Sequence, residues 1–97
     1  MNVAVPTKPL FESGQTVATP GALRALAEAN VGAWAYLKRH LTGDWGDVDR
    51  EDAAANDEAV RQGLRILSAY TLPTQQRIWI ITEADRSVTT VLLPLDY

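Results

Sequence analysis

The chain contains no cysteine, a single histidine, and no apolar run near the roughly 20 residues that a membrane-spanning helix needs. Without cysteine, neither a disulfide framework nor a thiolate-based active site or metal site can form within this chain. A single histidine likewise excludes a site built from several histidines of one chain. Residues 1–6 show neither the charge nor the apolar core of a signal peptide. These features predict a cytoplasmic protein without a membrane segment.

The familiar signatures of cofactor binding and catalysis are also missing. The sequence has no P-loop, no dinucleotide-binding glycine fingerprint, no Gly-x-Ser-x-Gly elbow and no Cys/His set at metal-ligand spacing. A calcium-binding loop counted from Asp47 fails because Asp52 stands at the position where such a loop needs glycine. We therefore expect no cofactor and no metal ion.

The composition is that of an ordinary globular protein. Of the 97 residues, 46% are hydrophobic and 22% are charged, which suits one domain with a single modest core. Residues 1–14 contain two prolines and few periodic apolar positions, so we expect a loose N-terminal arm that touches the domain through Leu10 and Phe11. Residues 15–97 are expected to form the single domain.

Residues 77–94 carry the clearest pattern in the sequence. β-Branched and aromatic residues fill 78–82 and 88–93, and polar residues occupy 83–87 between them. Such side chains fit a pleated surface and a short polar break favours chain reversal, so the pattern predicts a β-hairpin. Both of its faces are apolar, and it therefore needs cover on each face or a central place in a sheet. One face should carry Ile78 and Ile80 beside Leu93 and Val91, and the other Trp79 and Ile81 beside Leu92 and Thr90.

Two helices are expected in the first half of the chain. The first begins at Thr19, whose side chain can cap the free N–H groups ahead of a proline at the first helical position. The second spans residues 33–42 and places Trp34, Leu37 and Leu41 on one apolar stripe.

A third helix is expected to start at a capping residue, Asp47 or Asp49, and to continue through Leu64 with Gly63 inside it. Further strands are expected at residues 15–18 and 66–72. The fold class is therefore α+β, with three helices packed on one face of a three- to four-stranded antiparallel sheet that ends in a β-meander. Whether the first strand joins this sheet stays open.

Acidic residues concentrate in residues 44–58, where Arg50 is the only base. The favoured interpretation is the acid-rich start of a helix, which the helix dipole stabilises. The alternative is a surface that meets a basic partner. Because phosphate binding depends on clustered lysine and arginine, we expect no direct contact with nucleic acid. Trp45, in the turn at residues 43–47, either plugs the core, which is favoured, or anchors a partner.

Two further places hold polar chemistry. His40 could act in acid–base catalysis beside a carboxylate, although bonding the end of its own helix is the favoured role. At the hairpin tip, Glu83 and Arg86 could bind a partner or a phosphate, whereas Asp85 and Ser87 are ordinary turn residues. Both interpretations of the tip stay open.

Four motifs resemble those of a group of small bacterial proteins found in plasmid, phage and other mobile-element settings. They are TPGAL at residues 19–23, GDWGD at 43–47, LSAY at 67–70 and WIITEADRS at 79–87. The resemblance covers residues 15–97. It implies a mobile-element setting and brings no activity or catalytic residue with it.

Three functional hypotheses follow. The first is a non-enzymatic accessory protein of a mobile element that binds a protein with a basic surface, and so modulates a host defence or nucleic-acid-processing system. Its surface would comprise Asp44, Trp45, Asp47, Asp49, Glu51 and Asp52, with Glu83, Asp85 and Arg86 at the hairpin tip. The second is a small ribonuclease like barnase or RelE, by analogy of fold, acting through His40, Tyr70, Glu83 and Arg86. The third is a structural homo-oligomer that assembles through its sheet edge or hairpin faces.

Overall fold

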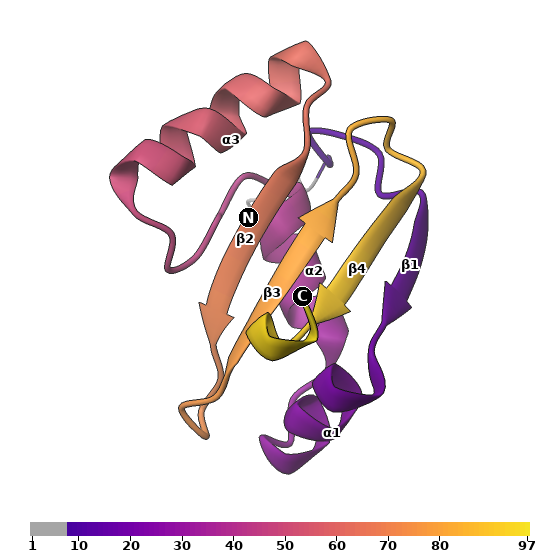
Figure 1. The fold of residues 1–97 in the computed structure, drawn as a ribbon, viewed down its shortest axis with the longest axis vertical. Coiled ribbons are helices and arrows are strands. Elements are labelled where there is room, and N and C mark those ends of the chain that lie inside the picture. Colours follow the sequence, from indigo (N-terminus) through magenta and orange to yellow (C-terminus); the bar gives the residue numbers. More distant parts are fainter. Residues whose placement is uncertain (1–7) are drawn as a thin grey trace, which may run out of the picture.

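The structure, a computed structural model, describes residues 8–97 (Figure 1). In chain order its elements are β1 (Gln15–Ala18), α1 (Pro20–Glu28), α2 (Ala33–Leu41), α3 (Arg50–Gln62), β2 (Ile66–Thr71), β3 (Arg77–Thr82), β4 (Val88–Leu92) and the short 3₁₀ helix η1 (Pro94–Asp96). The predicted α+β class is confirmed. None of the helices within residues 8–97 has the length and apolar character to cross a bilayer.

The four strands form one mixed sheet in the order β1-β4-β3-β2. β2, β3 and β4 make the predicted antiparallel meander. The predicted faces of the hairpin are confirmed, because Trp79 pairs with Leu92 and Ile80 pairs with Val91. β1 joins the sheet parallel to β4, with Val17 beside Thr90, so the sheet is not antiparallel throughout.

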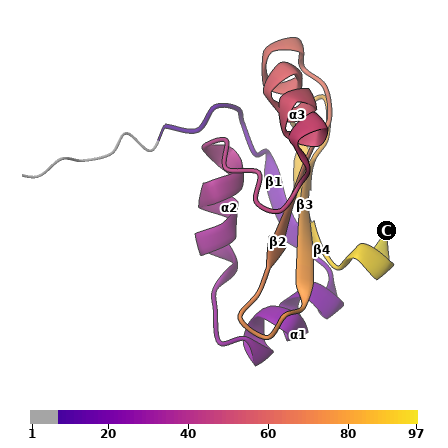
Figure 2. The ribbon, with the colours of Figure 1, turned by 90° about the vertical axis from the view of Figure 1, so that its left-hand side faces the viewer.

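The helices occupy different places around the sheet (Figures 1 and 2). α2 lies over one face, which we call the covered face, α1 lies at the lower end of the sheet, and α3 lies beside β2 at its edge. η1 lies on the other side of the sheet, which we call the open face. The expected packing on one face therefore describes α2, whereas α1 packs Ala22, Ala25 and Leu26 into the same core from the end of the sheet. α3 reaches the core from the edge, through its buried Ala59.

Two apolar clusters form the core beneath the helices. The larger lies between α1, α2 and the sheet and consists of Ala22, Ala25, Leu26, Leu37, Tyr70, Leu72, Ile78, Ile80 and Val91. The smaller lies near α3 and consists of Phe11, Leu41, Trp45, Ala59 and Ile66. Phe11 and the N–H of Leu10, which donates to the carbonyl of Leu41 (2.8 Å), tie the second half of the N-terminal arm to the domain. The arm's residues 1–7 lie outside the described residues.

The ends of α3 follow from local chemistry, and one expectation about them is wrong. Asp49, not Asp47, caps the helix by accepting the N–H of Asp52 (2.8 Å). The helix does not continue to Leu64. It stops at Gln62 because Gly63 adopts a left-handed conformation (φ 69°), the usual end of a helix at glycine.

Gly46 lets the chain close the outer edge of β2. The N–H of Ala69 donates to the carbonyl of Trp45 (3.1 Å), and the N–H of Asp47 donates to the carbonyl of Ala69 (2.6 Å). Gly46 has φ 75°, and a Cβ added there would lie 2.0 Å from the oxygen of Ala69. This approach is closer than any side chain allows, so the segment needs glycine.

We predict that Gly46→Ala destabilises the protein far more than Gly63→Ala, although both glycines have positive φ. At Gly63 nothing lies within 4 Å of an added Cβ, so the cost should be the left-handed backbone alone, about 1 kcal/mol. At Gly46 the clash with backbone should raise the loss to about 3 kcal/mol or more. Urea denaturation measures both, and equal losses would contradict the close approach.

Candidate functional site

The turn at Asp44 is held by an ion pair with α2. Nε of Arg39 lies 2.7 Å from one carboxylate oxygen of Asp44, and Nη2 lies 3.3 Å from the other. The hydrogen bond from Arg39 lowers the pKa of Asp44. The hydroxyl of Tyr70 donates to the carbonyl of Asp44 (2.7 Å). Asp44 is thus occupied in fixing the turn against α2 and β2.

Trp45 faces inward, so the alternative that it anchors a partner at the surface is wrong. Its side chain is only 6% exposed and belongs to the smaller core cluster. The indole N–H donates to a carboxylate oxygen of Asp57 (3.0 Å), which satisfies the polar end of an otherwise apolar ring. The favoured interpretation, in which Trp45 fills part of the core, agrees with this position.

Most other carboxylates of residues 44–58 also accept hydrogen bonds from within the domain. Asp47 accepts the hydroxyl of Thr71 on β2 (2.7 Å), and Asp49 caps α3. Glu58 accepts hydrogen bonds from Arg61 and Gln62 on its own helix, which lower its pKa. The acidic segment is therefore not one uniform surface, because several of its acids are fixed in turns and caps.

Glu51 and Asp52, in the first turn of α3, are exposed and differ from these acids. No hydrogen bond or ion pair of their carboxylates is recorded with residues 8–97. Asp52 borders a groove of about 290 Å³ between α3 and β2. The other residues that line this groove are Ala55, Asn56, Arg65 and Leu67.

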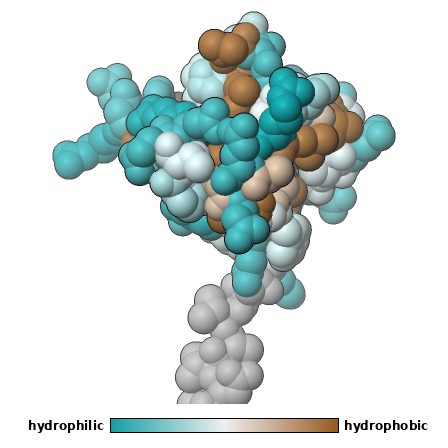
Figure 3. Space-filling view, turned by 90° about the horizontal axis from the view of Figure 1, so that it is seen from below, coloured by the Kyte–Doolittle hydropathy of each residue, from teal (hydrophilic) through white to brown (hydrophobic). Residues whose placement is uncertain are grey.

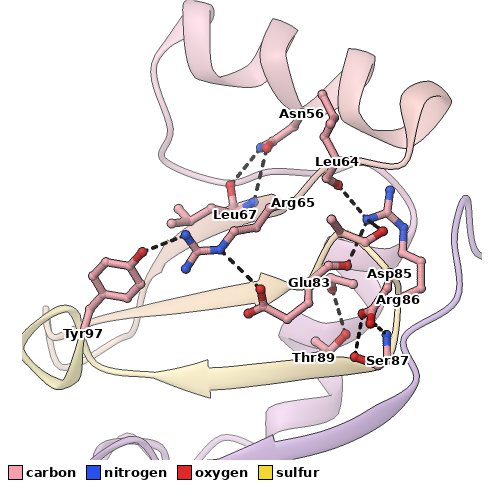
Figure 4. A network of polar contacts seen from close by, with 12 residues as sticks. Asn56, Leu64, Arg65, Leu67, Glu83, Asp85, Arg86, Ser87, Thr89 and Tyr97 are labelled. Carbon is pink, nitrogen blue, oxygen red and sulfur yellow. Dashed lines mark hydrogen bonds and ion pairs between the residues drawn. The ribbon is translucent and has the colours of Figure 1, made fainter.

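Polar contacts of Asn56 and Arg65 hold this groove, which we call the α3–β2 groove, in shape (Figure 4). Asn56 bonds the backbone of Leu67 twice: its amide donates to the carbonyl (2.8 Å) and its oxygen accepts the N–H (3.2 Å). Arg65 donates to the hydroxyl of Tyr97 (2.7 Å) and lies 3.8 Å from the carboxylate of Glu83. The charge of Arg65 is thus offset, and the unpaired charge at the groove is that of Asp52.

The hairpin tip is built mainly for structure. Arg86 donates to the carbonyls of Leu64 (2.6 Å) and Ala59 (2.9 Å), where α3 ends, and its guanidinium lies over the ring of Phe11. Asp85 accepts the hydroxyl (2.6 Å) and the N–H (3.0 Å) of Ser87, and these bonds lower the pKa of Asp85. The turn interpretation therefore describes Asp85. Arg86 binds helix carbonyls, a role that the sequence pattern did not reveal.

The four ribonuclease candidates are not brought together around a solvent-filled site. His40 is fully buried, and its nitrogens lie 2.6 Å from the hydroxyl of Ser68 and 2.9 Å from that of Thr82. It therefore bonds the sheet and not the end of its own helix. Tyr70 is 1% exposed, and burial raises the pKa of Tyr70 to about 12. Glu83 and Arg86 lie at the hairpin tip, in the contacts described above.

Trp34 is a surface residue that the sequence pattern placed wrongly. It is 65% exposed, whereas Leu37 and Leu41 are buried. The buried side of α2 consists of Leu37, His40 and Leu41, and the single histidine was not counted as part of that stripe. Trp34 borders a small hollow of about 140 Å³ beside Pro9 and Lys38. Viewed from below, brown apolar side chains interrupt the largely hydrophilic surface of the molecule (Figure 3).

No protein-family model, curated protein or solved structure matches this chain. Within residues 8–97, no three histidine, aspartate or glutamate side chains converge in a way that would hold a metal ion. The function of this chain must therefore be inferred from the contacts and exposure of its own side chains. Judged by these contacts, the candidate site is the α3–β2 groove, which Asp52 borders, together with the neighbouring exposed Glu51.

Protonation of His40 should weaken the fold below neutral pH. Burial, and to a lesser degree the charge of Arg86, lower the pKa of His40 to about 4 from its usual 6.5. The unfolded chain takes up this proton below about pH 6.5, whereas the folded chain stays neutral until about pH 4. Stability should therefore fall as pH decreases through this window, by about 3 kcal/mol at most.

The single histidine allows a direct test by NMR titration of its imidazole. A pKa near 4 is expected. Urea denaturation between pH 7 and pH 5 gives the stability, and a His40→Gln variant shows the slope that the carboxylates contribute alone. An imidazole that titrates near pH 6.5 would contradict the buried, neutral state.

Proposed function

We propose that this chain is a small non-enzymatic accessory protein that acts by binding a partner protein with a basic surface. The observation that carries the proposal is the α3–β2 groove, where exposed Asp52 stands beside the apolar side chains of Ala55 and Leu67. A lysine or arginine of the partner can lay its aliphatic stem along this apolar surface and place its charge at Asp52. Glu51, the preceding residue in the first turn of α3, is also exposed and adds to the negative potential of this turn.

The burial of the acid–base candidates favours binding over catalysis. A general base must come within hydrogen-bond reach of the proton that it removes. His40 is fully buried, and both of its nitrogens already face hydroxyl groups. Arg86 directs its donors to backbone carbonyls instead of to solvent. These contacts support a binding role. Of the four ribonuclease candidates, His40 and Tyr70 are buried and Arg86 is engaged by backbone carbonyls, so only Glu83, with a side chain 44% exposed, stays accessible.

The chemistry of the groove also indicates the kind of partner. Proteins that process nucleic acid carry clustered lysine and arginine to hold phosphates. The exposed acids of the first turn of α3, Glu51 and Asp52, are complementary to such a surface and would compete with the nucleic acid for it. Together with the resemblance to proteins of mobile elements, this complementarity favours a nucleic-acid-processing or defence protein of the host. The proposed effect is to modulate that protein by occupying its basic surface.

The proposal predicts that Glu51→Gln together with Asp52→Asn weakens binding to a partner isolated from the native host. The loss of two charges at the rim of an interface should reduce affinity by about tenfold. The cap of α3 should survive, because Asp49 accepts the backbone N–H of Asp52 and not its side chain. The measurement is the dissociation constant of wild type and variant at two salt concentrations. Added salt should weaken wild type more than the variant.

Glu28→Gln is the matched control, because Glu28 is an exposed acid at the end of α1, outside the acidic segment. It should bind as tightly as wild type. Equal affinity of all three proteins, or an equal loss in both variants, would show that the groove does not bind the partner.

A further inference from the structure

The two edges of the sheet differ in whether their outer backbone groups are hydrogen-bonded. The outer edge of β2 is closed by the segment around Gly46, which bonds Ala69 on both its N–H and its carbonyl. Within residues 8–97, β1 has β4 as its only neighbour in the sheet, so its other side is a free edge. Exposed edges invite pairing with another strand, and natural proteins often protect them with lysine, proline or a bulge. β1, with the sequence QTVA, has no such residue.

The backbone of β1 presents its free groups in a defined pattern. The N–H groups of Gln15 and Thr19 donate to Ser87 and Val91, both at 3.0 Å. Because backbone groups alternate in direction along a strand, the N–H and carbonyl of Val17 also face β4. Those of Thr16 and Ala18 therefore point away from the sheet. The free edge thus offers two donors and two acceptors, at two residues separated by one.

We propose that β1 pairs antiparallel with β1 of a second copy of this chain, around a two-fold axis at Val17. In this register Thr16 of each copy lies opposite Ala18 of the other, so all four free groups of each strand are bonded. If the register is shifted by two residues, only one hydrogen-bonded pair of residues remains between the two β1 strands instead of two. In the proposed register Val17 lies opposite its own counterpart, as a pair without hydrogen bonds, in which side chains approach most closely. The two sheets become one continuous sheet of eight strands.

A second copy suits this edge better than a charged peptide. β1 carries no charge, so it offers no complementary contact to an acidic or basic strand. Its pattern of donors and acceptors is self-complementary about Val17, which is the requirement of an interface between identical surfaces. Val17 is 39% exposed and projects on the open face beside Thr90, where the side chain of a second valine can cover it.

The expected dimer is weak. Two strands of four residues bury much less than the roughly 1,200 Å² typical of stable complexes. The protein should therefore be monomeric when dilute and dimeric when concentrated. This association uses a surface separate from the α3–β2 groove, so one proposal can fail while the other holds.

The absence of cysteine makes cross-linking a sharp test of the register. Across a non-hydrogen-bonded antiparallel pair the Cα atoms lie about 4.5 Å apart, within the range that a disulfide spans. Val17→Cys should therefore form a disulfide-linked dimer under mild oxidation at high protein concentration. Leu23→Cys, at a more exposed position on α1 (55% against 39% for Val17), is the control and should stay largely unlinked. Similar linkage in both variants would indicate random collision and overturn the proposal.

Sedimentation equilibrium of the unmodified chain supplies the second test. Wild type should show dimers that dissociate on dilution. Val17→Lys places two like charges opposite each other and should abolish the dimer, whereas Val17→Thr keeps a β-branched side chain and should retain it. A wild-type monomer at every concentration would overturn the proposal, as would a dimer that survives Val17→Lys. The Glu51→Gln, Asp52→Asn variant should dimerise like wild type, which separates this result from the test of partner binding.

Discussion

A row of buried hydrogen bonds centred on His40 joins the layers of this protein. The imidazole, carried by α2, bonds Ser68 on β2 and Thr82 on β3. Thr82 bonds Thr89 on β4 (2.7 Å), and Thr89 donates to the carbonyl of Ser13 (2.7 Å). Each of these polar groups would be costly to bury alone. Because the row is complete, and no buried side-chain nitrogen or oxygen in residues 8–97 lacks a partner, it fixes one arrangement of helix, sheet and arm.

Arg86 makes a second link of the same kind, between the hairpin tip, the end of α3 and the ring of Phe11. Its charge also disfavours a proton on His40, which keeps the central imidazole neutral. The residues with the most reactive chemistry in this chain are therefore engaged in holding it together. Surface chemistry remains at the α3–β2 groove and along the free edge of β1, and both are places suited to contact with another protein.

Local patterns were sufficient for much of the fold. The faces of the hairpin followed from alternation of apolar residues, and the helix start at Thr19 followed from capping chemistry, which left Asp47 and Asp49 as alternatives for the start of α3. The candidate site was harder to predict. Asp47 bonds Thr71, 24 residues later, and Trp45 bonds Asp57. The partners of Asp47 and Asp57 lie far away in the sequence. The local pattern therefore could not show whether these carboxylates are exposed charges or hydrogen-bond acceptors.

The sequence by itself determined the α+β class, the meander and the two faces of its hairpin, because these depend on side-chain periodicity and on residues close in the chain. Tertiary structure decided that β1 runs parallel to β4, that α3 lies at an edge, and that Trp34 is exposed while Trp45 is buried. It also separated the acids that fix turns from Glu51 and Asp52, whose carboxylates have no hydrogen bond or ion pair with the described residues 8–97. These outcomes depend on contacts between segments far apart in the sequence, and local periodicity carries no information about them.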